Sequence, residues 1–219
     1  MYTCADCGIL ACAKEERGWL PANCPMRDEE LFADILSAYE EPETRKFYIT
    51  SSAIEAEGYC KWPRLKETIE FCKKMEYHTI GLAFCKGLKK EAKVVAELLR
   101  SHGFVVVSVI CKTGGIPKEN AGIPKDKKIH PDQFEPMCNP IAQARLLNSR
   151  HTDFNIALGL CVGHDSLFYK HSDALVTTLV AKDRVLAHNP CGAIYCAEGY
   201  FMGRGPQVLH LRGGPGSGA

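Results

Sequence analysis

The sequence predicts an α/β fold with a doubly wound, mostly parallel sheet and a small N-terminal cysteine-rich module. Short, continuous apolar runs alternate with amphipathic helical patterns, as expected when parallel strands are covered on both faces. Four of the twelve cysteines come before this alternation begins, within the first 24 residues. We therefore expect a metal or cluster module over residues 1–28, an α/β domain over 29–212, and a flexible tail or cloning remnant over 213–219.

The elements of the α/β domain follow from hydrophobic periodicity. A connecting helix is expected over residues 29–39, a strand over 46–55 and a helix with one buried face over 61–75. Regular alternation then gives a strand, a helix ending in glycine and a second strand over 78–85, 87–103 and 104–111. The same alternation of strand and helix patterns continues in the later segments, at 140–150, 154–161, 165–172, 174–181 and 184–190.

The four N-terminal cysteines follow the pattern C-x2-C-x4-C-x11-C-P, at Cys4, Cys7, Cys12 and Cys24. A C-x2-C pair places two thiolates on one tight turn, and two more nearby thiols can complete a four-sulfur shell. Zinc and a [4Fe-4S] cluster both accept such a shell, so the ligand type leaves the metal open. Thiols without metal are a third alternative.

The spacing of these cysteines resembles a known cluster site. A similar C-x2-C-x4-C pattern with a fourth cysteine about a dozen residues later surrounds a [4Fe-4S] cluster of the nickel carbon monoxide dehydrogenases. The proline after Cys24 is also familiar from ferredoxins. This resemblance covers only about twenty residues. It implies an iron–sulfur cluster and a redox role, with zinc as the alternative.

A second group of cysteines is predicted at the ends of strands. Cys85, Cys111 and Cys161 each follow an apolar run, and Cys138 opens a helical pattern from a loop. Ligands of open α/β sheets bind beyond the carboxyl ends of the strands, so these thiols are candidates for a second cofactor site. Simple packing is the alternative, because free cysteine is often buried. Cys191 and Cys196 could supply or replace a ligand, whereas we expect Cys60 and Cys72 to be structural.

Polar residues and a long loop adjoin these strand ends. His164 and Asp165 follow Cys161 at a predicted strand-to-helix turn, where they are candidates for catalysis as acid, base or ligand. A histidine in a turn is more often solvated or a capping residue. The loop over residues 112–136 is rich in glycine, proline and lysine, and we expect it to cover the site. Its Lys-Thr-Gly-Gly start does not match a phosphate-binding P-loop, which argues against nucleotide hydrolysis.

A resemblance covers nearly the whole chain. The early cysteines together with "MCNPIAQARLLN", "GLCVGHDSLFYKHS" and "TTLVAKDRVLAHNP" resemble a bacterial domain-of-unknown-function family described only as cysteine-rich and metal-binding. The resemblance implies metal binding at Cys4, Cys7, Cys12 and Cys24 and names no reaction.

The composition limits the classes of partner that we expect the protein to bind. A formal net charge of +1 and the lack of a concentrated basic run give no reason to expect nucleic acid, and no apolar stretch is long enough for a membrane span. We expect a cytoplasmic protein whose cysteines serve as ligands, catalytic groups or core residues. Two functions remain open. One is a redox enzyme acting on a small-molecule substrate with one or two clusters. The other is a non-catalytic zinc or iron–sulfur protein that transfers electrons to a partner, delivers metal or senses it.

Overall fold

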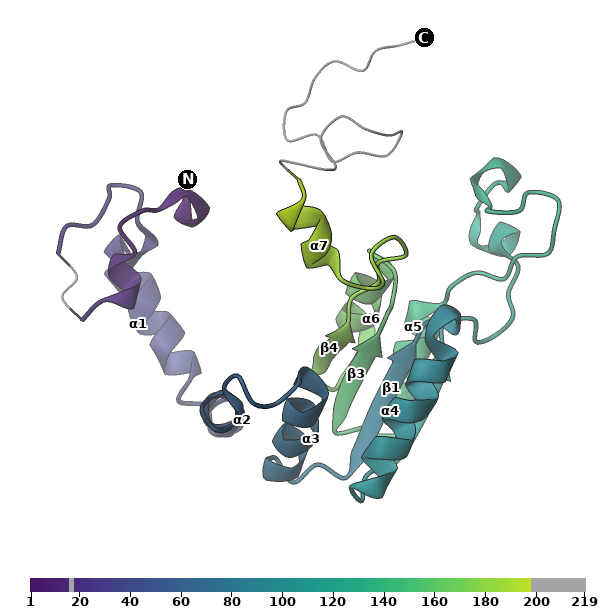
Figure 1. Cartoon of the computed structure of the whole chain (residues 1–219), viewed down its shortest axis with the longest axis horizontal. Helices are drawn as coiled ribbons and strands as arrows, with labels where there is room; N and C mark the ends of the chain where they lie inside the picture. The colour runs from purple at the N-terminus through teal and green to yellow at the C-terminus, as the bar shows by residue number, and fades with distance from the viewer. Residues whose placement is uncertain (16–17, 198–219) are drawn as a thin grey trace, which may run out of the picture. The chain divides into compact units, whose positions relative to one another are not determined.

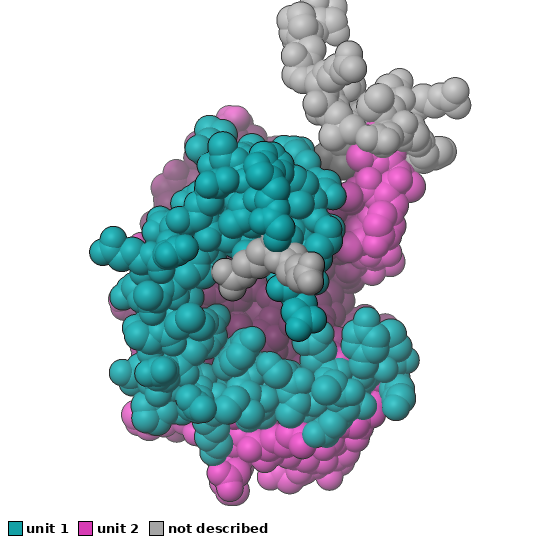
Figure 2. All heavy atoms as spheres, turned by 90° about the vertical axis from the view of Figure 1, so that its left-hand side faces the viewer, with its two compact units in different colours: residues 1–61 teal, residues 62–219 magenta. Residues whose placement is uncertain are grey.

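The computed structural model describes residues 1–15 and 18–197 and divides the chain into two compact units. The first unit runs from Met1 to Lys61 and the second from Trp62 onward, as coloured in Figure 2. The division thus falls after Lys61, whereas the sequence suggested a boundary at residue 28. The expected tail over 213–219 lies outside the described residues.

The described residues of the N-terminal unit form three short 3-10 helices followed by two α-helices (Figure 1). The 3-10 helices are η1 (Cys4–Asp6), η2 (Ala11–Ala13) and η3 (Pro25–Arg27), and the α-helices are α1 (Glu29–Ala38) and α2 (Pro42–Gly58). The helix predicted over residues 29–39 is confirmed. Asp28 caps its N-terminus, because the Asp28 carboxylate accepts a hydrogen bond from the backbone N–H of Leu31 at 3.1 Å.

The strand predicted over residues 46–55 is wrong, because this segment lies inside α2. Its aromatic and β-branched residues suggested a strand, but such propensities are weak and depend on context. Pro42 begins the helix with a φ angle already suited to it. Ile54 and Gly58, four residues apart, are the buried positions, as expected for one helical face.

The second unit is built on a four-stranded, fully parallel sheet in the order β2-β1-β3-β4, which confirms the predicted fold class. The strands are β1 (Thr79–Phe84), β2 (Val105–Ile110), β3 (Phe154–Leu158) and β4 (Val176–Val180). All five residues of β3 are buried, because both of its faces are covered and it has a neighbour on each side.

Helices cover both faces of this sheet (Figure 1). One face carries α3 (Arg64–Lys74) and α4 (Lys89–Ser101), and the other carries α5 (Pro140–Asn148) and α6 (His164–His171). A further short helix, α7 (Pro190–Tyr195), follows β4. The core on the α5 and α6 side combines residues of the strands, of the two helices and of the loop after β3: Ala83, Ala144, Leu147, Ala157, Leu160 and Phe168.

The strand order creates a switch point between β1 and β3. The chain leaves β1 toward β2 on one side, and the connection to β3 brings it back to the other side of β1. Connections that diverge in this way leave a crevice beyond the carboxyl ends of the two neighbouring strands, where open α/β proteins bind their ligands. Cys85 follows β1 directly, so it lies at this switch point.

The expected strand over residues 154–161 is shorter than predicted. It ends at Leu158, and Cys161 comes three residues later. Gly159 turns the chain here with φ +66°, and a side chain at this position would place its Cβ 2.0 Å from Leu88 Cδ1. Separately, none of the described helices is both long and apolar enough to cross a membrane.

Candidate functional site

The four N-terminal cysteines line one cavity. Although Cys4 and Cys24 are twenty residues apart, they and Cys7 and Cys12 surround a space of about 360 Å³ within the first unit. The rest of the wall is largely apolar and includes Trp19, Leu10 and Met26. The structure therefore brings together all four residues that the spacing marked as metal ligands.

Local hydrogen bonds hold the two ends of this segment together. The Asn23 side-chain amide donates to the Thr3 hydroxyl at 2.6 Å, which places the backbone of Cys24 near that of Cys4. The Arg27 guanidinium donates through Nε to the carbonyl of Pro21 at 2.8 Å and fixes the turn before Cys24. The segment is thus organised by its own short-range contacts.

Backbone N–H groups point at the Cys7 sulfur. Hydrogen bonds from the N–H of Leu10, and then of Ile9, lower the pKa of the Cys7 thiol. Leu10 adopts a left-handed conformation with φ 49°, the kind of turn that lets successive N–H groups converge. A thiolate that receives N–H bonds is stabilised in the charged form that a metal ligand requires.

The second unit contains a larger cavity at the carboxyl ends of the strands. Its volume is about 530 Å³, and all four cysteines predicted for a second site line it: Cys85, Cys111, Cys138 and Cys161. Cys85 and Cys111 are buried, with 9% and 4% exposure, whereas Cys138 and Cys161 are partly exposed. These thiols come from four separate chain segments that the fold has brought to one place.

Cys111 is the central member of this group. Its thiol interacts with both Cys138 and Cys85, and together with burial these contacts raise its pKa strongly. The backbone N–H of Lys86 also donates to the Cys111 sulfur, at 3.3 Å. The hydrogen bond from Cys111 is the main reason why the pKa values of Cys85 and Cys138 are lowered. The geometry therefore favours a protonated Cys111 between two more acidic thiols.

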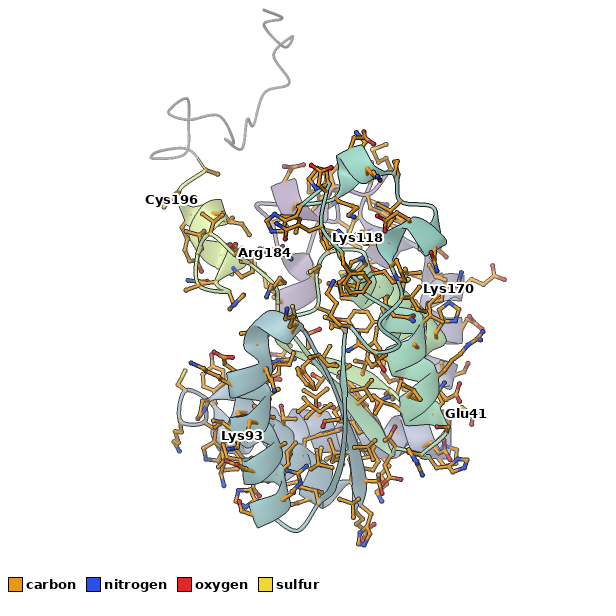
Figure 3. All side chains as sticks on the ribbon, turned by 90° about the vertical axis from the view of Figure 1, so that its right-hand side faces the viewer. Glu41, Lys93, Lys118, Lys170, Arg184 and Cys196 are labelled. Atoms are coloured by element: carbon orange, nitrogen blue, oxygen red, sulfur yellow. The ribbon has the colours of Figure 1, made fainter. Side chains whose placement is uncertain are left out.

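Each of the other three thiols has its own cation. Lys182 Nζ lies 3.5 Å from the Cys85 sulfur, and Arg184 donates to the Cys161 sulfur at 3.0 Å. The Lys112 ammonium, by its charge and a hydrogen bond, helps to lower the pKa of Cys138. Figure 3 shows Arg184 and Lys118 beyond the strand ends, whereas Lys93 lies on α4 beside the sheet.

The loop over residues 112–136 forms one wall of this cavity, as expected for a covering loop. It supplies Lys118, Ile123, Lys127, Ile129 and Glu135. The loop is internally braced, since the buried Lys128 donates to Glu119 and to the Gln133 carbonyl, both at 2.6 Å. An antiparallel backbone bridge pairs Pro117 with Pro136, the last residue of the loop.

The two residues predicted for catalysis differ in position. His164 begins α6 and lines the cavity, and its charge contributes to the lowered pKa of Cys138. Asp165 is absent from the lining that the described residues provide, and its carboxylate accepts the backbone N–H of Ser166 at 2.8 Å. Cys191 and Cys196 are likewise outside that lining.

Lys182 and Arg184 were not singled out from the sequence. They follow β4 by two and four residues, so the strand-end rule that selected the cysteines also applies to them. Gln143 of α5 was missed as well: its amide donates to the carbonyls of Phe84 and Val109 at 3.3 and 2.8 Å. It thereby links the ends of β1 and β2 just before Cys85 and Cys111.

Neither cysteine group is arranged as a ready cage for a single ion. Throughout residues 1–15 and 18–197, no three or more His, Cys, Asp or Glu side chains form a group that could hold one metal ion.

The fold and this site define a class: an open parallel α/β protein with a thiol-lined cavity at its switch point. The chain belongs to the DUF1847 family, described as a protein of unknown function, which matches residues 24–179. The matched region includes all four strand-end cysteines but begins at Cys24, so it omits Cys4, Cys7 and Cys12. The chain is also 51% identical over 167 residues to an uncharacterized protein of Methanocaldococcus jannaschii, covering 76% of this chain and 84% of that archaeal relative.

Proposed function

We propose that the chain is a redox protein whose N-terminal unit holds an iron–sulfur cluster and whose α/β unit binds a small substrate at the strand-end thiols. The ligands of the cluster are Cys4, Cys7, Cys12 and Cys24. The observation that carries this proposal is the shared cavity of about 360 Å³ that these four cysteines line. When bound, such a cluster supplies one-electron transfer.

The cavity supports a cluster better than zinc. In a tetrahedral zinc site the four sulfurs lie about 2.3 Å from a single point, which leaves no internal space. A polynuclear cluster spreads its four thiolates over separate corners and therefore does not need them to meet at one point. The N–H groups of Leu10 and Ile9 that bond to Cys7 add to this argument, because hydrogen bonds to the sulfurs also tune clusters.

We assign the strand-end thiols to substrate rather than to a second cluster. The Cys111 sulfur already accepts a hydrogen bond from the backbone N–H of Lys86 at 3.3 Å. Cationic side chains also contact two of these thiols: Lys182 lies beside the buried Cys85 sulfur, and Arg184 donates to the partly exposed Cys161 sulfur. Partly exposed thiols beside cations, here Cys138 and Cys161, are the kind that react with small molecules.

The test is metal analysis of the anaerobically purified full chain and of the Cys7→Ser variant. The full chain should be brown, contain iron and sulfide, and show a broad visible absorption that bleaches on reduction. Cys7→Ser should lose most of that iron and colour. The matched control is Cys60→Ser, which removes an exposed cysteine outside the cavity and should retain both.

The alternative is a non-catalytic zinc protein. It predicts a colourless chain with stoichiometric zinc that Cys7→Ser releases. Unchanged metal content in Cys7→Ser would contradict both the iron–sulfur and the zinc proposal. In either case, replacing one of the four cysteines leaves only three thiolate ligands.

A further inference from the structure

The side chains around the strand-end cavity carry mostly positive charge. Its lining contains five cationic side chains, and Lys182 adds a sixth through its contact with Cys85. The five are Lys86, Lys112, Lys118, Lys127 and Arg184. Of these, Lys127 is paired with the exposed Asp126 at 3.5 Å.

The one carboxylate that the described residues contribute to this lining is already engaged. Glu135 pairs with Lys118 and accepts the backbone N–H groups of Ile129 and His130 at 2.9 and 3.2 Å. Even with Cys85 and Cys138 ionised, the cations around the cavity outnumber the negative groups. The cavity is therefore electropositive in a protein whose formal net charge is only +1.

The apolar part of the lining strengthens the positive electrostatic field in the cavity. Ile123, Met137, Ile141 and Leu167 form low-dielectric walls, and charges interact more strongly beside such walls than in open water. A cleft of one charge sign raises the local concentration of small ions of the opposite sign. At about 530 Å³ the cavity has the size of an ordinary small-molecule site.

We propose that the strand-end cavity binds a small oxyanion beside Cys138 and Cys161. This inference names the ligand class of the substrate site proposed above and is independent of the N-terminal cluster. Cys161 is the best placed thiol for an incoming anion, because it is partly exposed and Arg184 lies 3.0 Å from its sulfur. Cys85 and Cys111 lie deeper, where burial restricts access.

Competing alkylation measures this property at each cysteine. The full reduced chain is treated separately with iodoacetate and with neutral iodoacetamide, and each site is quantified by peptide mass spectrometry. In both reactions a thiolate attacks the CH₂ carbon, a C–S bond forms, the C–I bond breaks and iodide leaves with the bonding electrons. The ratio of the two rates thus isolates the effect of the reagent's charge.

We expect that ratio to be roughly tenfold higher at Cys161 and Cys138 than at Cys191, an exposed cysteine outside the described lining. Arg184→Gln should lower the ratio at Cys161 several-fold. The matched control Lys93→Gln removes an exposed lysine on α4 away from the strand ends and should leave it unchanged. Buried Cys85 and Cys111 should react slowly with both reagents.

Competition separates a bound anion from general attraction. Acetate or inorganic phosphate should slow iodoacetate at Cys161 more than sodium chloride does at equal ionic strength, which screens charge without occupying the site. The more potent competitor tells whether a carboxylate or a phosphate is preferred. Protection no better than that by chloride would overturn the proposal.

Two other results would also overturn it. One is an equal ratio at Cys161, Cys138 and Cys191, or a ratio that Arg184→Gln leaves unchanged. The other is complete resistance of all four strand-end cysteines to both reagents, which would mean that the thiols are ligands or packed core. The same experiment on Cys7→Ser separates this inference from the cluster, since loss of metal should leave the ratios as they are.

Discussion

Cysteine chemistry in this protein is set residue by residue by the immediate surroundings. Cys72 is fully buried on α3, and burial raises the pKa of its thiol to about 12. It is therefore an inert core residue, as the sequence suggested. Cys7 receives backbone N–H bonds that lower its pKa. The same side chain thus serves packing in one place and is a candidate ligand in the other.

Gly81 is a single position on which the sheet depends. It lies in β1, where an added Cβ would come 1.8 Å from Asn155 Oδ1 and 2.9 Å from Leu147 Cδ1. Both neighbours are fully buried, and Asn155 is held by hydrogen bonds from Thr152 and to Ser172, each 2.8 Å. The helix α5 packs closely on the sheet because this residue has no side chain.

We therefore predict that Gly81→Ala lowers the free energy of unfolding by about 1–3 kcal/mol through overpacking. Urea denaturation followed by circular dichroism measures the change. The matched control is Gly87→Ala, whose Cβ would first meet the flexible tip of Lys182 at 3.3 Å. That change should stay within about 0.5 kcal/mol. Equal stability of Gly81→Ala and the unmodified chain would disprove the tight packing.

At the scale of elements, the loop over residues 112–136 is stabilised by polar contacts that Glu135, near its end, makes with residues earlier in the loop. Lys118 holds the pKa of the Glu135 carboxyl down at about 2, and the N–H groups of His130 and Ile129 contribute in the same direction. A carboxyl whose pKa is lower in the folded state stabilises that state above its unfolded pKa. The stabilisation is lost as the pH falls through the folded value.

We expect the loop to be fully protected above about pH 4.3, the ordinary glutamate pKa, and to lose protection as the pH falls toward 2. Hydrogen exchange at the Ile129 and His130 amides, corrected for intrinsic rates, measures this change. Glu135→Gln should show low protection at neutral pH and little pH dependence in this range. Glu97→Gln on α4 is the matched control and should behave like the unmodified chain. Identical exchange in Glu135→Gln would rule out the carboxylate as the stabilising group.

At the scale of the whole molecule, the chain consists of two units with different kinds of stabilisation. The second unit contains the sheet and its two helical layers. Within the first unit, the described buried residues are few and include Ala11 and Ile54. A unit with so little buried apolar surface commonly needs a metal or cluster to be stable.

This contrast predicts that a fragment beginning at Trp62 folds without the N-terminal unit. It should keep a cooperative urea transition, because the core of the sheet lies entirely within it. It should contain no iron and still show the iodoacetate preference at Cys161. A fragment that unfolds without cooperativity would show that the first unit is needed for the sheet.

The sequence by itself determined the fold class and the two groups of cysteines. Continuous apolar runs marked the buried strands, and parallel strands direct their carboxyl ends to one edge, so the convergence of Cys85, Cys111, Cys138 and Cys161 on one cavity could be anticipated. The local spacing of Cys4, Cys7, Cys12 and Cys24 anticipated the other cavity in the same way. Both predictions rest on periodicity or short-range geometry, which are properties of the sequence alone.

Only the tertiary structure decided the surroundings of these groups. Residues 46–55 are helical because they lie inside α2, which begins at Pro42 and buries Ile54 and Gly58 on one face. These features of the longer helix outweigh the local strand preference. The pairing of Lys182 with Cys85 and of Arg184 with Cys161 spans 97 and 23 residues, and no periodicity links such partners. The raised pKa of Cys111 depends on contacts with two thiols from other segments, Cys138 and Cys85. Charge, burial and hydrogen bonding act through space. They could be assigned only from the tertiary structure, because the strand order determines which strand ends are neighbours.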